Sequence, residues 1–183
     1  TVETVGMPSF SELGEEGRLS VCFSTQVGCP MGCEFCATGK EGFTRNLTAS
    51  EMIDQIIAVK NDFNHRVSNL VAMGQGEPFL NYDELLTALR FLNDQNGPSI
   101  GARHITISTC GLIDGINQLA QEPEQFTLAI SLHSAIKEKR DELMPTMRSQ
   151  TLPMLKSALS AYIEKTNRRV TLEYLLIEGF NDG

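Results

Sequence analysis

Short segments of alternating apolar and polar residues, separated by longer amphipathic segments, run through most of this chain and limit the folds open to it. Alternation with a period of two is typical of a strand, and apolar residues three or four apart are typical of a helix. We expect strands at residues 19–25, 70–73, 105–109, 127–132 and 170–177. Helices are expected at residues 49–61, 82–92, 113–120 and 152–165. Thr48 and Glu51 form a capping box that opens the first helix. This order of elements predicts an α/β fold with a parallel sheet.

The two faces of these strands differ, and the difference separates an open sheet from a barrel. Strands of a doubly wound sheet are buried on both faces and tend to be apolar throughout. Here Ile105 and Ile107 alternate with polar residues that include Ser108, and the next strand places Ser131 and His133 on its polar face. A sheet with one solvated face is the simplest alternative, but parallel sheets rarely leave a face open. We therefore expect a partial (β/α) barrel of about five parallel strands, with outer helices and a polar lumen that holds a ligand.

The composition excludes several classes of protein. Fifteen Lys and Arg against 23 Asp and Glu give a net charge of −8 over 183 residues, and 41% of the residues are hydrophobic. That balance argues against a disordered chain and against an indiscriminate nucleic-acid binder. No apolar run approaches the ~20 residues of a membrane span, and the first residues do not resemble a signal peptide. We therefore expect a cytoplasmic protein with no membrane contact.

Three of the five cysteines lie within eight residues, directly after the first predicted strand. An odd number of unevenly spaced cysteines favours a metal or redox site in a reducing compartment over a disulfide framework. Cys29, Cys33 and Cys36 follow the pattern C-x3-C-x2-C, whereas structural zinc usually takes four ligands from two C-x2-C pairs. Cys22 and Cys110 are isolated on their strands and supply no second pair. The triplet favours a four-iron cluster with one iron open to a ligand from outside the protein, with zinc as the alternative.

With Phe35 before the last cysteine, the triplet resembles the signature of the radical S-adenosylmethionine (SAM) superfamily. Within it, the chain is similar along nearly its whole length to the RNA adenine-C2 methyltransferases. The similarity rests on segments 22–29, 35–47, 73–78, 108–111, 131–133, 173–174 and 179–182. It implies methylation of C2 of an adenosine in large-subunit (23S-type) ribosomal RNA and, in bacteria, in certain tRNAs. It also implies a 4Fe-4S cluster, two SAM molecules, and an electron donor such as a flavodoxin or ferredoxin.

The resemblance assigns roles to individual residues. The cluster ligands are Cys29, Cys33 and Cys36, and the residues that contact SAM are Gly76, Glu77, Ser108, Ser131, Leu132 and His133. Glu3 corresponds to the family's proton-acceptor glutamate, and Cys22 to the cysteine that resolves a covalent intermediate by forming a disulfide. Gly74 and Gly76 also look like the start of a dinucleotide-binding fingerprint, but its third glycine is missing. We interpret Cys110 as a packing residue.

We expect residues 1–18 to be an irregular lead-in and residues 19–183 to form the radical SAM core, with an incomplete barrel. Members of the family that the chain resembles carry an N-terminal accessory domain that binds RNA. They also carry a late cysteine that is methylated and then passes the methyl group on. The chain contains neither, so the resemblance identifies a catalytic core fragment that we expect to be inactive in methyl transfer on its own.

Three other functions share parts of this pattern. An antibiotic-resistance relative methylates C8 of the same adenosine and has nearly the same motifs. A glycyl-radical activase shares the cysteine triplet but should lack Cys22 and the segment 45–47. A zinc-stabilised binding module accounts for the cysteines without any catalysis. The methyltransferase core accounts for more of these features and is the leading interpretation.

Overall fold

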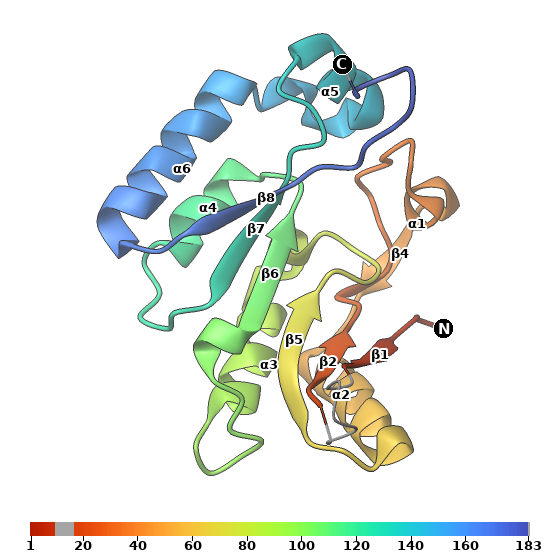
Figure 1. Ribbon diagram of the computed structural model, residues 1–183, viewed down its shortest axis with the longest axis vertical. Helices are drawn as coiled ribbons and strands as arrows, with labels where there is room; N and C mark the ends of the chain where they lie inside the picture. The colour runs from red at the N-terminus through yellow and green to blue at the C-terminus, as the bar shows by residue number, and fades with distance from the viewer. Residues whose placement is uncertain (10–16, 183) are drawn as a thin grey trace.

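The computed structural model describes residues 1–9 and 17–182, which form a six-stranded sheet in the order β1-β2-β5-β6-β7-β8 (Figure 1). Its strands are β1 (Val5–Pro8), β2 (Leu19–Cys22), β5 (Val67–Ala72), β6 (Ile105–Thr109), β7 (Thr127–Ser131) and β8 (Val170–Glu173). The β1 strand runs antiparallel to β2, and all other neighbours are parallel. A separate antiparallel pair joins β3 (Gln26–Gly28) to β4 (Phe43–Asn46). The predicted α/β fold with five parallel strands is confirmed.

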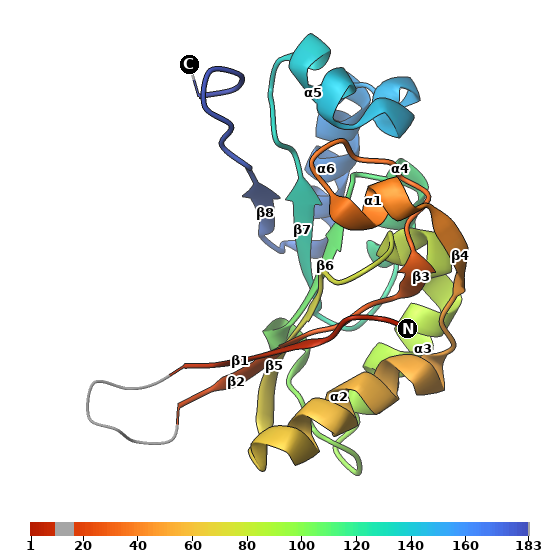
Figure 2. The same cartoon turned by 90° about the vertical axis from the view of Figure 1, so that its right-hand side faces the viewer.

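The helices that cover the sheet lie on one side of it, as Figure 2 shows from the edge. They are α2 (Ala49–Phe63), α3 (Tyr82–Asn93), α4 (Ile113–Leu119) and α6 (Leu152–Thr166). The helices α1 (Ala37–Glu41) and α5 (Lys137–Leu143) lie near the carboxyl ends of the strands. Short 3-10 turns occur at Pro78–Asn81, Ala102–His104 and Pro145–Ser149. In the described part of the chain, no helix is long and apolar enough to cross a membrane.

The strand faces differ as the alternation predicts. Val21, Leu70 and Ile107 are buried in a single apolar cluster with residues of α2, α3 and α4. Cys22 and Thr106, their neighbours along the strands, are only partly buried. Because successive side chains point to opposite faces, these polar and thiol groups lie on the face away from the helices. That face is the one available to a ligand.

The expected irregular lead-in at residues 1–18 contains a strand, because Val5–Pro8 form β1. Gly6 allows this strand to lie against α2, since a Cβ there would come within 2.5 Å of the Phe63 ring. Glycine and proline within four residues are uncommon in strands, so the sequence V-G-M-P carries little strand signal. Residues 10–16 of the expected lead-in, and residue 183 at the end of the expected core, lie outside the described residues.

The start of α2 is formed by the predicted capping box. The Thr48 N–H donates to Glu51 Oε2 at 2.9 Å, and the Glu51 N–H donates to Thr48 Oγ1 at 3.3 Å. Arg45 donates to both carboxylate oxygens of Glu51, at 2.8 and 2.7 Å. These hydrogen bonds lower the pKa of Glu51 to about 2. The Arg45 charge, one of the few basic groups near the cysteine loop, is therefore paired within the protein.

Candidate active site

The carboxyl ends of β5, β6, β7 and β8 meet the cysteine loop around one pocket of about 250 Å³. In parallel sheets and barrels these ends share one edge, and that edge is where such folds bind ligands. The pocket is lined by every residue that we expected to hold the cluster and SAM, except Leu132. Leu132 is half-buried and packs against the main apolar cluster instead. The structure therefore does not bring the Leu132 side chain to the pocket wall.

The cysteine loop, residues 29–36, is held by main-chain hydrogen bonds and by packing. The Cys29 N–H donates to the Gly42 oxygen at 2.9 Å, and the Glu34 N–H donates to the Leu143 oxygen at 3.0 Å. A second apolar cluster supports the loop, and its buried members are Met31, Cys33, Leu143, Met144 and Met147. The segment from α5 to the following 3-10 turn thus forms a base on which the loop rests.

A fourth thiol lies beside the loop cysteines. The Sγ atom of Cys33 is 4.0 Å from that of Cys110, at the end of β6. Cys110 packs against the second apolar cluster, in agreement with its interpretation as a packing residue, and the fold also brings it next to a cysteine of the triplet. Burial raises the pKa of Cys29 to about 11. Among the described residues, no three Cys, His, Asp or Glu side chains converge as they would around a single metal ion.

Glu77 is a buried carboxylate that links the ends of two strands. It is 2% exposed, and its Oε2 accepts the Cys110 N–H at 2.7 Å while its Oε1 accepts the Phe79 N–H at 3.1 Å. Burial raises the pKa of Glu77, and these N–H donors offset part of the shift. Gly76 precedes it with a φ of +106°, and a Cβ there would lie 2.6 Å from Gln26. Only glycine fits this turn.

Glu173, at the end of β8, organises the opposite wall. Its Oε2 accepts the Ser108 hydroxyl at 2.7 Å and the Ser131 hydroxyl at 3.1 Å, so one carboxylate spans three strands. A serine hydroxyl has a single proton to donate, and each of these serines donates it in a hydrogen bond to Glu173. Both serines therefore present only lone pairs to the pocket, and the wall favours a ligand group that donates hydrogen bonds.

His133 closes the pocket on the side of β7. Its backbone is left-handed, with a φ of +56°, and its Nδ1 accepts the Leu175 N–H at 3.1 Å. Burial lowers the pKa of His133, so the ring is neutral near pH 7 and carries its proton on Nε2. The Phe35 ring contacts the imidazole edge-on, with the ring centroids 4.6 Å apart. Asn181 donates to the His133 carbonyl at 2.7 Å and holds the bend in place.

Glu3 and Cys22 do not line this pocket. Val5 pairs with Cys22 across β1 and β2, and Glu3 is close enough to Cys22 to raise the pKa of its thiol, although burial contributes more. The Met73 N–H hydrogen-bonds the Cys22 sulfur, and Met73 is itself part of the pocket wall. Cys22 thus lies next to the site, on the face away from the helices.

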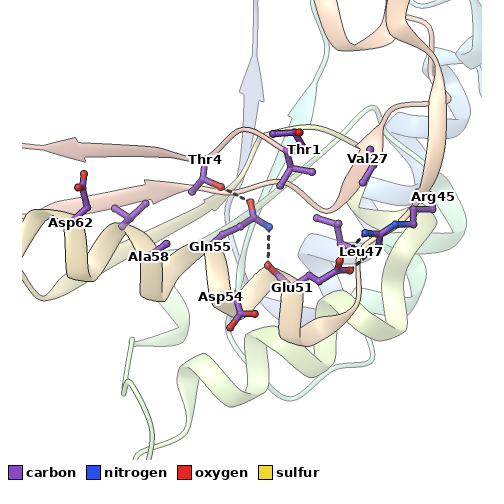
Figure 3. A pocket seen from close by; sticks show the side chains of 12 residues that line it. Thr1, Thr4, Val27, Arg45, Leu47, Glu51, Asp54, Gln55, Ala58 and Asp62 are labelled. Atoms are coloured by element: carbon purple, nitrogen blue, oxygen red, sulfur yellow. Dashed lines mark hydrogen bonds and ion pairs between the residues drawn. The ribbon is translucent and has the colours of Figure 1, made fainter.

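A roomier cavity of about 810 Å³ lies between the first residues of the chain and α2. Figure 3 shows Gln55 at its centre, where its Oε1 accepts the Thr4 hydroxyl at 2.6 Å. Gln55 also bonds both main-chain groups of Ser24, at 2.9 and 3.0 Å. The Arg45–Glu51 pair lines the same cavity. The residues of this cavity fasten the N-terminal segment to α2, and none of the expected site residues is among them.

Three residues at the site were not predicted as functional. Glu173 was part of a recognised segment without an assigned role, and Cys110 was interpreted as packing. Arg140 is 2% exposed and donates to the Cys110 carbonyl at 2.8 Å. It stands in the sequence K-E-K-R-D-E-L of α5, which has the charge pattern of a solvated surface helix. No signal in the sequence separates Arg140 from its exposed neighbours.

The fold and the site together define a class of cofactor-binding α/β enzyme. Its features are a parallel sheet, a pocket at the carboxyl edge of that sheet and a three-cysteine loop beside the pocket. The chain belongs to the radical SAM superfamily, whose family model matches residues 23–183. A radical SAM methyltransferase from Sphaerobacter thermophilus has a similar structure, with a TM-score of 0.91 and 45% identity. The match covers all of this chain and 52% of that one.

Curated relatives support the same grouping. A protein of Nostoc punctiforme named probable dual-specificity RNA methyltransferase RlmN is 52% identical over 99% of this chain and 50% of its own length. A protein of the same name from Alkaliphilus oremlandii is 51% identical over 90% of this chain and 48% of its own length. The chain therefore spans about half the length of the curated relatives it matches.

The environment of Cys22 predicts how its reactivity depends on pH. Because its pKa is raised, the thiol stays protonated to a higher pH than an ordinary cysteine near 8.5. We expect iodoacetamide to label Cys22 slowly at pH 8, with a midpoint of labelling above 8.5 when followed peptide by peptide with mass spectrometry. Glu3→Gln removes a nearby negative charge and should speed labelling at pH 8 by roughly twofold.

The matched control is Glu164→Gln, an exposed change on α6. It should leave the labelling of Cys22 unchanged. A midpoint below 8.5 would contradict the burial of the Cys22 thiol, and equal rates in the wild type and Glu3→Gln would contradict the placement of Glu3 beside Cys22.

Proposed function

We propose that the chain is the catalytic core of an RNA methyltransferase that methylates C2 of an adenosine in large-subunit ribosomal RNA and in certain tRNAs. The observation that carries the proposal is the single pocket that gathers three loop cysteines with Glu77, Ser108, Ser131 and His133. The similarity to proteins named dual-specificity RNA methyltransferase supports the same class of substrate.

The donor set fits a 4Fe-4S cluster. Cys29, Cys33 and Cys36 offer three sulfur ligands from one loop, and sulfur is the ligand such clusters take. Structural zinc usually takes four ligands from two C-x2-C pairs, whereas this loop supplies a single C-x3-C-x2-C triplet. When bound, the cluster supplies the electron that splits SAM reductively. The cysteines hold it, and the loop's packing keeps them on the pocket wall.

The remaining pocket residues suit the polar groups of SAM. Glu77 is a buried carboxylate that provides an acceptor for the SAM ammonium, beside the backbone of Gly76. Ser108 and Ser131 accept hydrogen bonds from the ligand because both donate to Glu173. His133 offers its Nε2–H, and Leu132 precedes it, directly after β7. These residues bind and orient the cofactor in the pocket.

Glu3 and Cys22 form a second functional pair in this proposal. Glu3 acts as the proton acceptor, and Cys22 resolves a covalent adduct by forming a disulfide with a second cysteine. The location of Cys22 beside Met73 is compatible with that role. Two SAM molecules are used, one as the methyl donor and one as the radical source. A flavodoxin or ferredoxin supplies electrons, and the protein works in the cytoplasm on RNA.

The first test measures the cluster. Reconstituted with iron and sulfide without oxygen, the protein should bind about four irons per chain and show a broad brown absorption. Replacing Cys29, Cys33 or Cys36 by Ala should abolish both. Cys110→Ala is the matched control, because it removes a neighbouring thiol that is not a ligand, and it should keep the iron. Tight binding of one zinc with no iron uptake would show that the site is a zinc site.

The second test measures the reaction. Because the chain spans about half the length of its curated relatives, it is first joined to the remaining N-terminal and C-terminal segments of one of them. This extended protein is reconstituted and incubated with SAM, a reductant and large-subunit ribosomal RNA, and the RNA is then digested to nucleosides. The 183-residue chain is treated in the same way and should produce no methylated nucleoside. 2-Methyladenosine is the expected product of the extended protein, and it should disappear in the Cys33→Ala variant. The alternative function, methylation of C8, uses the same site and would appear as 8-methyladenosine. Modification of neither position under conditions in which the wild type splits SAM would refute the proposed substrate.

A further inference from the structure

Arg140 is a buried cation without an anionic partner. Its side chain is 2% exposed, and its Nη2 donates to the Cys110 carbonyl at 2.8 Å. Its Nε is buried with no hydrogen-bond partner, and no ion pair involves Arg140 within residues 1–9 and 17–182. A buried charge that nothing compensates destabilises a protein strongly. The position therefore calls for an anion that the surrounding residues do not supply.

Two carboxylates close to this position are engaged with other groups. Asp141, the next residue along α5, pairs with Lys137. The oxygens of Glu77 accept the N–H groups of Cys110 and Phe79, whereas Arg140 donates to the Cys110 carbonyl. Neither carboxylate bonds the guanidinium. The charge of Arg140 is left for a different partner.

Arg140 lies behind the cysteine loop. The residue that it bonds, Cys110, has its Sγ 4.0 Å from the Sγ of Cys33, and Arg140 and Cys33 interact electrostatically. Arg140 is not part of the pocket wall. A ligand in the pocket therefore interacts with the positive charge of this guanidinium over a distance and does not contact the group directly. Arg140 acts on the site through its charge.

We propose that Arg140 is the counter-charge of an anionic iron–sulfur cluster held by Cys29, Cys33 and Cys36. This inference rests on the proposed function. Three thiolate ligands make such a site negative, and reduction adds one more negative charge. In a low-dielectric interior, a fixed cation stabilises the reduced form more than the oxidised form. Arg140 thereby raises the reduction potential of the cluster and eases the uptake of the electron. It is a positioning residue that tunes the cofactor without touching the substrate.

The test is a reductive titration of the reconstituted protein, followed by electron paramagnetic resonance. Arg140→Gln keeps a hydrogen-bond donor but removes the charge, and it should shift the midpoint potential to a lower value. Arg140→Lys keeps the charge and should stay near the wild type. Arg148→Gln is the matched control: it removes the same charge from an exposed site in the neighbouring turn, and it should cause no shift. Arg140→Met, of similar length and apolar, replaces the Gln variant if that variant does not fold.

Each outcome decides the inference. A lower potential in Arg140→Gln or Arg140→Met, with rescue in Arg140→Lys, supports the counter-charge. Equal potentials in all variants would overturn it. Equal shifts in the Lys and Gln variants would also overturn it, because they would show that the shape of the guanidinium matters and its charge does not. A wild-type protein that takes up no iron would refute the proposed function together with this inference, whereas iron uptake with an unchanged potential would refute the inference alone.

Discussion

The geometry of the site depends on one buried carboxylate. Glu77 accepts the Cys110 N–H at 2.7 Å and the Phe79 N–H at 3.1 Å, and so it ties the turn after β5 to the end of β6. Arg140 donates a hydrogen bond to the Cys110 carbonyl, so both main-chain polar groups of Cys110 are bonded. Because each of these groups is costly to bury alone, they stabilise one arrangement and exclude looser ones. The cysteine loop and the wall that contains Ser108 and Ser131 line the same pocket as Cys110.

Much of the fold follows from the sequence, because several strands alternate between apolar and polar residues and the helix signals are strong. The β6 strand has the predicted bounds, and Thr48 and Glu51 cap α2 as expected. The polar faces of β6 and β7 also bring Ser108 and Ser131 to the same wall. The alternation of side chains between the two faces of a strand is enough to predict this placement of the two serines, since parallel strands share a carboxyl edge. The family resemblance adds the roles, which geometry by itself does not assign.

Other features depend on contacts between distant residues and leave little trace in a single sequence. The β1 strand exists because Gly6 can lie against Phe63, 57 positions later, although V-G-M-P has weak strand propensity. Glu173 gains its importance from two serines on other strands. Arg140 looks like a surface residue until tertiary packing buries it. Tertiary context outweighs local pattern at all three positions.

The central claim is that a single pocket holds both the cluster, through the cysteine loop, and SAM, through the walls at the ends of the strands. The most direct measurement is the electron paramagnetic resonance spectrum of the reduced, reconstituted protein, recorded without and with SAM. If one iron lacks a protein ligand and SAM occupies the same pocket, adding SAM should change the signal of the cluster. An identical spectrum in the presence of SAM, when equilibrium dialysis shows that SAM is bound, would place SAM elsewhere and contradict the account.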